Sequence, residues 1–260
     1  MRIDVITAFP GMFAGFLGES MLARALAQGI LTITIHDLRD FADDPHRTID
    51  DTPFGGGGGM ILKAEPVARA IEMICPGCQG DTDTALIIPT PRGKLFCQEI
   101  AGELAGRNHL VFVCGHYTGI DERIYEHFRP RRLCIGDYVL SGGELPTMAI
   151  IDSVSRLLPG FLGNEESGRN DSFVRPGLGA PQYTRPQSWR GLDVPDVLIS
   201  GHHAKVSEWR EQSRRQTTEQ FRPDLIGSSD TDSTDAADGQ DPHEAPPENG
   251  HSPLAEKTRR

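Results

Sequence analysis

Three short glycine-bearing segments of the chain have the composition of a nucleoside-binding site. They are residues 90–93, 115–119 and 136–143. Glycine lets the backbone approach a ligand closely and adopt positive φ, so the amides of such loops can bind an adenine edge or a ribose without long side chains. Each segment taken alone is also typical of an ordinary tight turn. The chemistry therefore depends on whether the fold brings the three segments together.

Two other motifs suggest phosphate or metal chemistry but lack essential parts. The five glycines at residues 55–59 are not followed by the Gly-Lys-Ser/Thr ending with which a phosphate-binding loop reaches phosphates and magnesium. Cys75 and Cys78 have the spacing of half a zinc or redox site, but no second ligand pair of that spacing follows. We interpret the cysteine motif as a turn that ends a helix, and we predict no metal site.

Alternating strand and helix patterns predict how these loops are positioned. Short apolar runs predict buried strands at residues 3–9, 30–35, 85–89, 109–114 and 133–135. Helical spacing occurs at residues 13–27, 64–74, 96–104, 121–128 and 145–158. This alternation predicts an α/β fold with a mainly parallel sheet and helices on both faces. Because such sheets bind ligands at the carboxyl ends of their strands, the three loops should share one pocket.

The composition indicates a protein of the cytoplasm. The 260 residues suffice for one large domain or two modest ones. The five cysteines lie mostly within apolar runs, which is typical of a reducing compartment. The N-terminal segment lacks the apolar core of a signal peptide, and no apolar run approaches the roughly 18 residues of a membrane span. We expect no membrane contact.

The net charge of −11 argues at first against a nucleic-acid partner. However, residues 227–260 contain eight acidic and three basic residues, a net charge of −5, in a stretch rich in Ser, Asp, Gly and Pro. This composition predicts a disordered acidic tail. Basic clusters remain at residues 129–132 and 210–222, and a local patch decides the partner. The total charge therefore does not exclude RNA.

The second part of the chain predicts a small helical unit. Residues 161–175 are polar and turn-rich, and a charged helix follows at residues 205–221. We therefore divide the chain into a sheet domain (1–160), a linker (161–175), a small, mainly helical domain (176–226) and the tail (227–260). The basic side chains of the third part are suited to RNA phosphates. A solvated charged face is the alternative, because Glu208, Glu211 and Glu219 are interspersed with them.

Several long motifs resemble one family of RNA-modifying enzymes. VCGHYTGIDER at residues 113–123 and IGDYVLSGGELPTMAIIDSVSRLLPG at residues 135–160 are similar, nearly residue for residue, to bacterial tRNA (guanine(37)-N(1))-methyltransferases of the knotted (SPOUT) superfamily. Motifs at residues 46–60, 171–173, 183–186 and 201–210 extend the resemblance over residues 1–226. Motifs of this length in the right order are highly specific. The resemblance implies a deep trefoil knot in the sheet domain.

The same resemblance implies the reaction and its participants. A methyl group would pass from S-adenosyl-L-methionine to N1 of guanine 37 of tRNA, with magnesium left open as a second cofactor. The enzyme would act as a homodimer on tRNA and not on DNA. Two alternatives stay open: methylation of a ribose 2′-hydroxyl by a related knotted enzyme, and RNA binding without turnover.

The resemblance also assigns the binding residues. The expected cofactor contacts are Thr90, Pro91, Gly115, Tyr117, Gly119, Ile135, Gly136, Asp137, Tyr138, Val139, Leu140, Gly142 and Gly143. The expected tRNA contacts are His46, Arg47, Asp50, Gly57, Arg185, Lys205, Arg210 and Arg214. The chain departs from the family at Thr118, where an acidic residue is usual, and in its glycine run, which often includes a proline.

Methylation of guanine N1 makes two chemical demands. N1 carries a proton and becomes a good nucleophile when that proton leaves, while negative charge spreads onto O6. A carboxylate base and a cationic partner for O6 meet these demands. The resemblance assigns them to Asp171 and Arg156, which composition alone would interpret as a helix N-cap and a surface ion pair. We expect Asp171, in the linker, to complete the active site of a second subunit.

Overall fold

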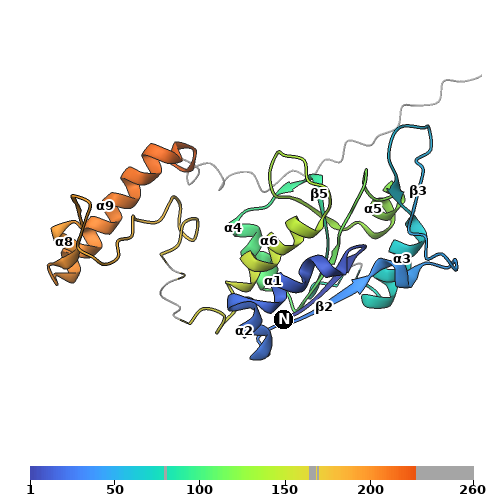
Figure 1. Ribbon diagram of the computed structural model, residues 1–260, viewed down its shortest axis with the longest axis horizontal. Coiled ribbons are helices and arrows are strands. Elements are labelled where there is room, and N and C mark those ends of the chain that lie inside the picture. Colours follow the sequence, from blue (N-terminus) through green and yellow to red (C-terminus); the bar gives the residue numbers. More distant parts are fainter. Residues whose placement is uncertain (79–80, 164–167, 169, 227–260) are drawn as a thin grey trace, which may run out of the picture.

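The computed structural model describes residues 1–78, 81–163, 168 and 170–226 (Figure 1). Its central feature is a five-stranded sheet in which every neighbouring pair of strands is parallel. The prediction of an α/β fold with a mainly parallel sheet is confirmed. In spatial order the strands are β2 (Thr32–Asp37), β1 (Arg2–Thr7), β6 (His109–Val113), β5 (Thr84–Leu95) and β7 (Arg131–Cys134).

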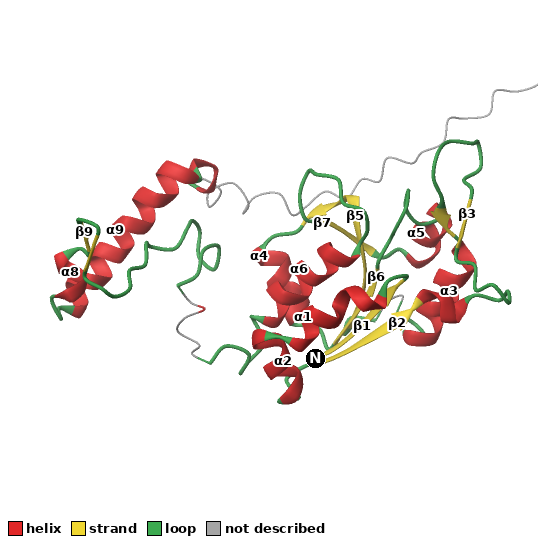
Figure 2. Ribbon diagram, in the orientation of Figure 1, coloured by secondary structure: helices red, strands yellow, loops and turns green. Residues whose placement is uncertain are grey.

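Helices cover both faces of this sheet (Figure 2). On one face, α3 (Ala64–Ile74), α5 (Glu122–Phe128) and the 3-10 helix η2 (Leu38–Phe41) pack on a core that includes Ile6. On the other face, α4 (Gln98–Ala105), α6 (Glu144–Ser155) and the 3-10 helix η1 (Pro10–Phe13) pack on a core that includes Ile3 and Val5. Successive strand residues point to opposite faces, so one apolar run such as β1 supplies both cores.

The first predicted helix, residues 13–27, is broken in two. α1 (Ala14–Gly18) ends at Glu19, whose backbone is extended, and α2 (Ser20–Ala27) begins at a residue with φ of 59°. Phe13, just before α1, joins the main core and Leu22 of α2 joins a satellite cluster with Phe161, whereas Phe16 and Leu17 of α1 pack against both. By contrast, α3 spans the predicted residues 64–74.

Two irregularities shape the carboxyl edge of the sheet. β5 contains an excursion, since Pro89 and Lys94 both lie opposite Leu133 of β7. The segment at residues 90–93, predicted as a loop, is thus an interruption within one long strand. A separate hairpin of β3 (Asp50–Asp51) and β4 (Ile61–Leu62) carries the five-glycine run away from the sheet (Figure 1).

The cysteine motif after α3 forms a turn, as predicted from the sequence. Cys75 is the C-terminal cap of α3, and its sulfur is bonded to that of Cys78. Along the described residues, no three His, Cys, Asp or Glu side chains are grouped in a way that would hold a metal ion. The described helices also include none that is long and apolar enough to cross a bilayer.

Beyond α6, the chain leaves the sheet and forms a separate group of elements (Figure 1). A two-stranded hairpin, the charged helix and two short helices make up this group: β8 (Ser188–Trp189), β9 (Leu192–Asp193), α8 (Asp196–Ile199), α9 (His203–Phe221) and the 3-10 helix η3 (Pro223–Leu225). Tyr183 and Trp209 contact each other, with ring centroids 6.3 Å apart, and so join the segment before the hairpin to α9. The predicted acidic tail, residues 227–260, lies outside the described residues.

Candidate active site

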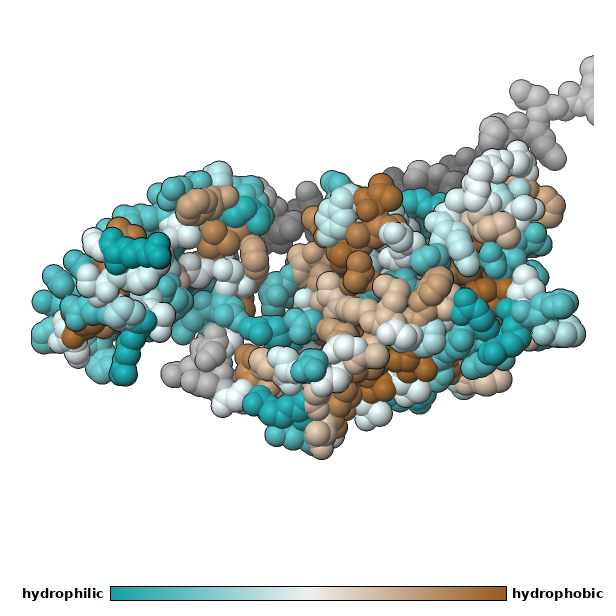
Figure 3. Space-filling model, viewed as in Figure 1, coloured by the Kyte–Doolittle hydropathy of each residue, from teal (hydrophilic) through white to brown (hydrophobic). Residues whose placement is uncertain are grey.

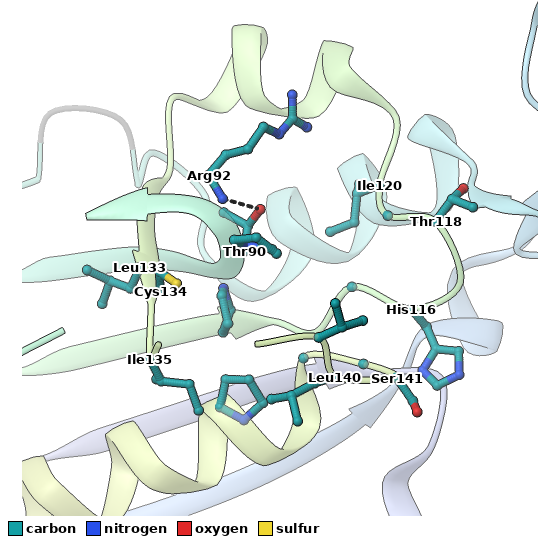
Figure 4. Close-up of a pocket in the computed structure, with 18 of the residues that line it drawn as sticks. Thr90, Arg92, His116, Thr118, Ile120, Leu133, Cys134, Ile135, Leu140 and Ser141 are labelled. Atoms are coloured by element: carbon teal, nitrogen blue, oxygen red, sulfur yellow. Dashed lines mark hydrogen bonds between the residues drawn. The ribbon is translucent and has the colours of Figure 1, made fainter. Parts of the chain in front are cut away.

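The three glycine-bearing segments line one pocket at the carboxyl edge of the sheet. Its volume is about 340 Å³, at the small end of the range for ligand sites. Figure 4 shows Thr90 of β5 and Ile135 and Leu140 of the loop after β7 around the same space. All the expected cofactor contacts except Asp137 line it: Thr90, Pro91, Gly115, Tyr117, Gly119, Ile135, Gly136, Tyr138, Val139, Leu140, Gly142 and Gly143.

The loop between β7 and α6 lies directly against the end of β6. The amide of Gly143 donates a 2.7 Å hydrogen bond to the carbonyl of Gly115. A Cβ atom added at Gly143 would lie 2.8 Å from Cα of Cys114, so only glycine permits this approach without a shift. The pocket floor is therefore made of closely packed backbone, which is suited to hydrogen bonding with a nucleoside.

Tyr125 and Arg92 line one wall of the pocket. The guanidinium carbons of Arg92 and of Arg132, which is not among the lining residues, are 5.7 and 4.3 Å from the centre of the Tyr125 ring. Glu122 bridges the two arginines with contacts of 2.7 and 3.2 Å. Burial raises the pKa of the Tyr125 hydroxyl, despite the nearby positive charges. The wall is thus a neutral ring held by a charged network, which the sequence motifs did not reveal.

His116 and Glu144 are a second pair that sequence reasoning missed. His116 lines the pocket beside Ser141 (Figure 4), and Glu144 is buried at the start of α6. Oε1 of Glu144 accepts a 2.7 Å hydrogen bond from Thr7 of β1. The available signal was the acidic residue that ends the glycine motif, because a carboxylate at the first turn of a buried helix requires a partner.

Thr118 joins the five-glycine loop to the pocket. Its backbone amide and its hydroxyl both donate to the carbonyl of Met60, at 3.0 and 2.5 Å. The amide of Leu62 in turn donates to the carbonyl of Gly119 at 3.0 Å. These bonds bring the loop containing Gly57, an expected tRNA contact, to the pocket rim. The hydroxyl of Thr118 is therefore engaged within the protein.

The other expected tRNA contacts near this loop have local partners. Arg47 forms an ion pair with Asp40 and has positive φ, so it holds the turn before β3. Asp50 lies in β3, opposite Leu62 of β4. His46 is exposed, and its amide donates to Asp44.

Asp171 and Arg156 lie together but far along the chain from the pocket. Nη2 of Arg156 is 2.5 Å from Oδ2 of Asp171, and both side chains are exposed. Arg156 follows the last residue of α6, whereas the pocket lies at its first. Twelve helical residues separate the two ends by about 18 Å. The two residues therefore lie at the far end of α6 from the pocket of their own chain.

Comparison with known proteins agrees with this geometry. The family described as tRNA (guanine-1)-methyltransferase TrmD matches residues 1–228. A tRNA (guanine-N(1)-)-methyltransferase of Geobacillus kaustophilus is 50% identical over 226 residues, covering 87% of this chain and 91% of the relative. Its counterpart in Geobacter sulfurreducens is 46% identical over 236 residues, covering 90% and 95%. The chain belongs to the tRNA (guanine-1)-methyltransferase family.

The residues that match the methyltransferase family include the basic C-terminal elements. Arg185 and Arg210 line a common cavity beside α9, and Lys205 is exposed on that helix. Arg214 is different, because its side chain is only 11% exposed. It donates to the carbonyls of Leu178 and Pro176 at 3.1 and 3.2 Å, so it fastens the preceding segment to α9.

Proposed function

We propose that the chain transfers a methyl group from S-adenosyl-L-methionine to N1 of guanine 37 in tRNA. The observation that carries this proposal is the pocket built from three glycine-bearing loops in a chain of this family. S-adenosylmethionine supplies an electrophilic methyl group when it is bound. The close backbone approach at Gly143 supports recognition of its nucleoside part.

Asp171 and Arg156 are the proposed catalytic residues. The carboxylate of Asp171 takes the N1 proton and so frees the N1 lone pair, to which the bound cofactor would supply its methyl group and leave as S-adenosylhomocysteine. Arg156 stabilises the negative charge that develops on guanine O6. Their mutual ion pair is exposed and contributes about 0–1 kcal/mol, so guanine can replace it at little cost.

We propose that the chain forms a homodimer, in which these residues act at the pocket of the partner subunit. Arg156 lies about 18 Å along α6 from the pocket of its own chain, and Asp171 is paired with it. We therefore propose that a second copy of the chain provides the base. The loop that closes the pocket and the first turn of α6 expose apolar side chains suited to burial between subunits: Tyr138, Val139 and Leu140 of the loop and Leu145 of α6, of which Val139 is 95% exposed. Figure 3 shows apolar atoms gathered over this loop.

The trefoil knot is part of the proposal. α5 packs on one face of the sheet and α6 on the other, so the chain that leaves β7 crosses the carboxyl edge between them. It passes against Cys114 and Gly115 at the end of β6, as the contacts of Gly143 indicate. We propose that this crossing passes through the loop around residues 90–93.

The remaining assignments concern the partner and the compartment. We propose that residues 1–160 bind the cofactor, that residues 161–175 link this domain to a tRNA-binding domain at residues 176–226, and that the protein acts in the cytoplasm. The proposed tRNA contacts are His46, Arg47, Asp50, Gly57, Arg185, Lys205, Arg210 and Arg214. Magnesium dependence is tested by adding a chelator to the methyl-transfer reaction.

Transfer of labelled methyl groups to unmodified tRNA, followed by nucleoside analysis, tests the function. The proposal predicts 1-methylguanosine, which a tRNA with adenine at position 37 should not yield. A 2′-O-methylnucleoside would instead indicate ribose methylation. Binding of tRNA without any product would indicate an RNA-binding protein that lacks turnover.

Mixed dimers test whether the active site is shared. Gly136→Val disturbs the pocket, because its Cβ would lie 2.3 Å from the Tyr138 ring, and Asp171→Ala removes the base. A heterodimer of these two variants keeps one intact site and should recover up to half the activity. Asp171→Ala with Arg156→Ala should not recover, because both residues come from the same chain. If activity recovered only in the mixture of Asp171→Ala with Arg156→Ala, the proposal that one chain provides both residues to its partner's pocket would be contradicted.

A further inference from the structure

Glu144 and His116 form a buried pair that the proposed chemistry does not use. Glu144 is 1% exposed, and Thr7 satisfies only its Oε1. Oε2 of Glu144 and Nδ1 of His116 are buried, have no hydrogen-bond partner within the described part of the chain, and lie 3.8 Å apart. Leaving two such atoms unpaired is costly, so each is the available partner of the other.

Neighbouring groups enclose the two facing atoms of the pair, although the His116 side chain is 21% exposed. A Cβ atom at Gly142 would lie 2.3 Å from Oε2 and 2.5 Å from Nδ1, so the backbone of this glycine covers both atoms. Phe9 packs on the other side of the His116 ring, with centroids 4.5 Å apart, and separates it from Arg39. Cys114 also faces Glu144, but burial raises the pKa of its thiol and keeps it neutral.

The pocket itself contains no negative side chain. Neither Asp nor Glu occurs among its described lining residues, and Arg92 contributes a positive charge. S-adenosylmethionine, however, carries a positively charged ammonium group and a positively charged sulfur. The Thr118 hydroxyl donates its hydrogen to the carbonyl of Met60; its oxygen can still accept, but it carries no negative charge. Glu122 is already paired with Arg92 and Arg132, whereas Glu144 lies 3.8 Å behind His116 and its Oε2 has no hydrogen-bond partner among the described residues.

The orientation of the His116 ring follows from its buried edge. Because Nδ1 faces Glu144 and is buried, the accessible edge of the ring carries Nε2. A carboxylate that accepts from Nδ1–H fixes the tautomer and leaves the other nitrogen with a free lone pair.

We propose that Glu144 holds His116 in its Nδ1–H tautomer, so that Nε2 accepts a hydrogen bond from the ammonium group of the cofactor's methionine part. In this arrangement Glu144 is a positioning residue and His116 is a binding residue. The negative charge of Glu144 polarises the imidazole ring and so strengthens the hydrogen bond that Nε2 accepts from the ammonium group. The inference rests on the proposed function, since it requires that this pocket binds S-adenosylmethionine.

Nitrogen NMR of the full chain tests the tautomer. Wild-type His116 should show a protonated Nδ1 and an unprotonated Nε2. Glu144→Gln should reverse this pattern, because its amide donates to Nδ1 while its oxygen still accepts from Thr7. A protonated Nε2 and an unprotonated Nδ1 in the wild type would overturn the assignment. This signature does not depend on catalytic activity.

Two adenosine ligands test the ammonium contact. S-adenosylhomocysteine contains the amino-acid part, whereas 5′-methylthioadenosine lacks it. His116→Phe keeps the packing on Phe9 and should weaken binding of S-adenosylhomocysteine about tenfold, with 5′-methylthioadenosine unchanged. Adding Thr118→Glu to this variant should restore part of the loss, because it returns an acceptor to the rim. His203→Phe, on the exposed start of α9, is the matched control.

The outcomes separate this inference from the proposed function. Equal weakening of both ligands by His116→Phe would overturn the ammonium contact while leaving the cofactor pocket intact. Unchanged binding of both ligands would overturn it as well. If the wild-type chain bound neither ligand, the proposed function would fall together with the inference.

Discussion

Replacing Gly143 with alanine should displace the loop that closes the cofactor pocket. The added Cβ would lie 2.8 Å from Cα of Cys114 and 2.9 Å from N of Gly115, whereas ordinary contact begins at 3.4 Å. Both obstacles are backbone atoms at the end of a central strand, so the loop has to move by about 0.6 Å. This movement also weakens the 2.7 Å bond from Gly143 to Gly115. Overpacking of this kind costs about 1–3 kcal/mol.

The expected effect is measurable by calorimetry. If cofactor binding requires the loop in its original position, a cost of about 2 kcal/mol lowers the affinity for S-adenosylhomocysteine about thirtyfold. Gly58→Ala is the matched control, because its added Cβ meets nothing within 4 Å. Circular dichroism checks that both variants fold. Equal affinities in the two variants would refute the argument that the loop is held directly against β6.

Three further predictions concern stability and the tail. Burial alone would raise the pKa of Asp4, but hydrogen bonds from His36, His109 and Arg2 lower it below 3.8. The ionised Asp4 therefore stabilises the fold above pH 3.8, and this contribution is lost as the pH falls through the lower pKa of the folded state. Asp4→Asn should therefore cost about 3 kcal/mol in urea unfolding at pH 7 and flatten the acid limb of the stability curve; an unchanged acid limb would contradict this. Arg214→Met should cost about 2 kcal/mol and increase proteolysis near Pro176, unlike Arg215→Met on the exposed side of α9; equal proteolysis of the two variants would count against the fastening role. Removal of residues 227–260 should leave methyl transfer intact, and a large loss of rate would show that the tail is needed.

Sequence periodicity was sufficient for the sheet but not for the irregular parts. Apolar runs identified β1, β2, β5, β6 and β7, because buried parallel strands are continuous apolar segments. The break between α1 and α2 escaped it, because both halves carry apolar residues at helical spacing and the break lies in the backbone of Glu19 and Ser20. The excursion in β5 escaped it for a similar reason, since Thr90 and Pro91 are typical of a turn whether or not the strand resumes.

The site residues divide in the same way. Glycines were predictable because tight backbone contact restricts the residue type, as at Gly143. The partnership of Glu144 with His116 was not, because it joins residues from two loops and depends on burial that motifs do not record. The ion pair of Arg156 with Asp171 likewise required coordinates, because the sequence gives the length of α6 but not the contact between these two side chains.

The bonds from Thr118 and Gly119 to the five-glycine hairpin have a thermodynamic consequence. Any ligand that fixes the conformation of residues 115–119 also restricts Met60 and Leu62, which are hydrogen-bonded to that segment. If tRNA contacts the hairpin, cofactor and tRNA then share one conformational cost, and the ligand that binds first bears most of it. Linkage requires the effect to be reciprocal, so S-adenosylhomocysteine should raise the affinity for tRNA by the same factor by which tRNA raises the affinity for S-adenosylhomocysteine.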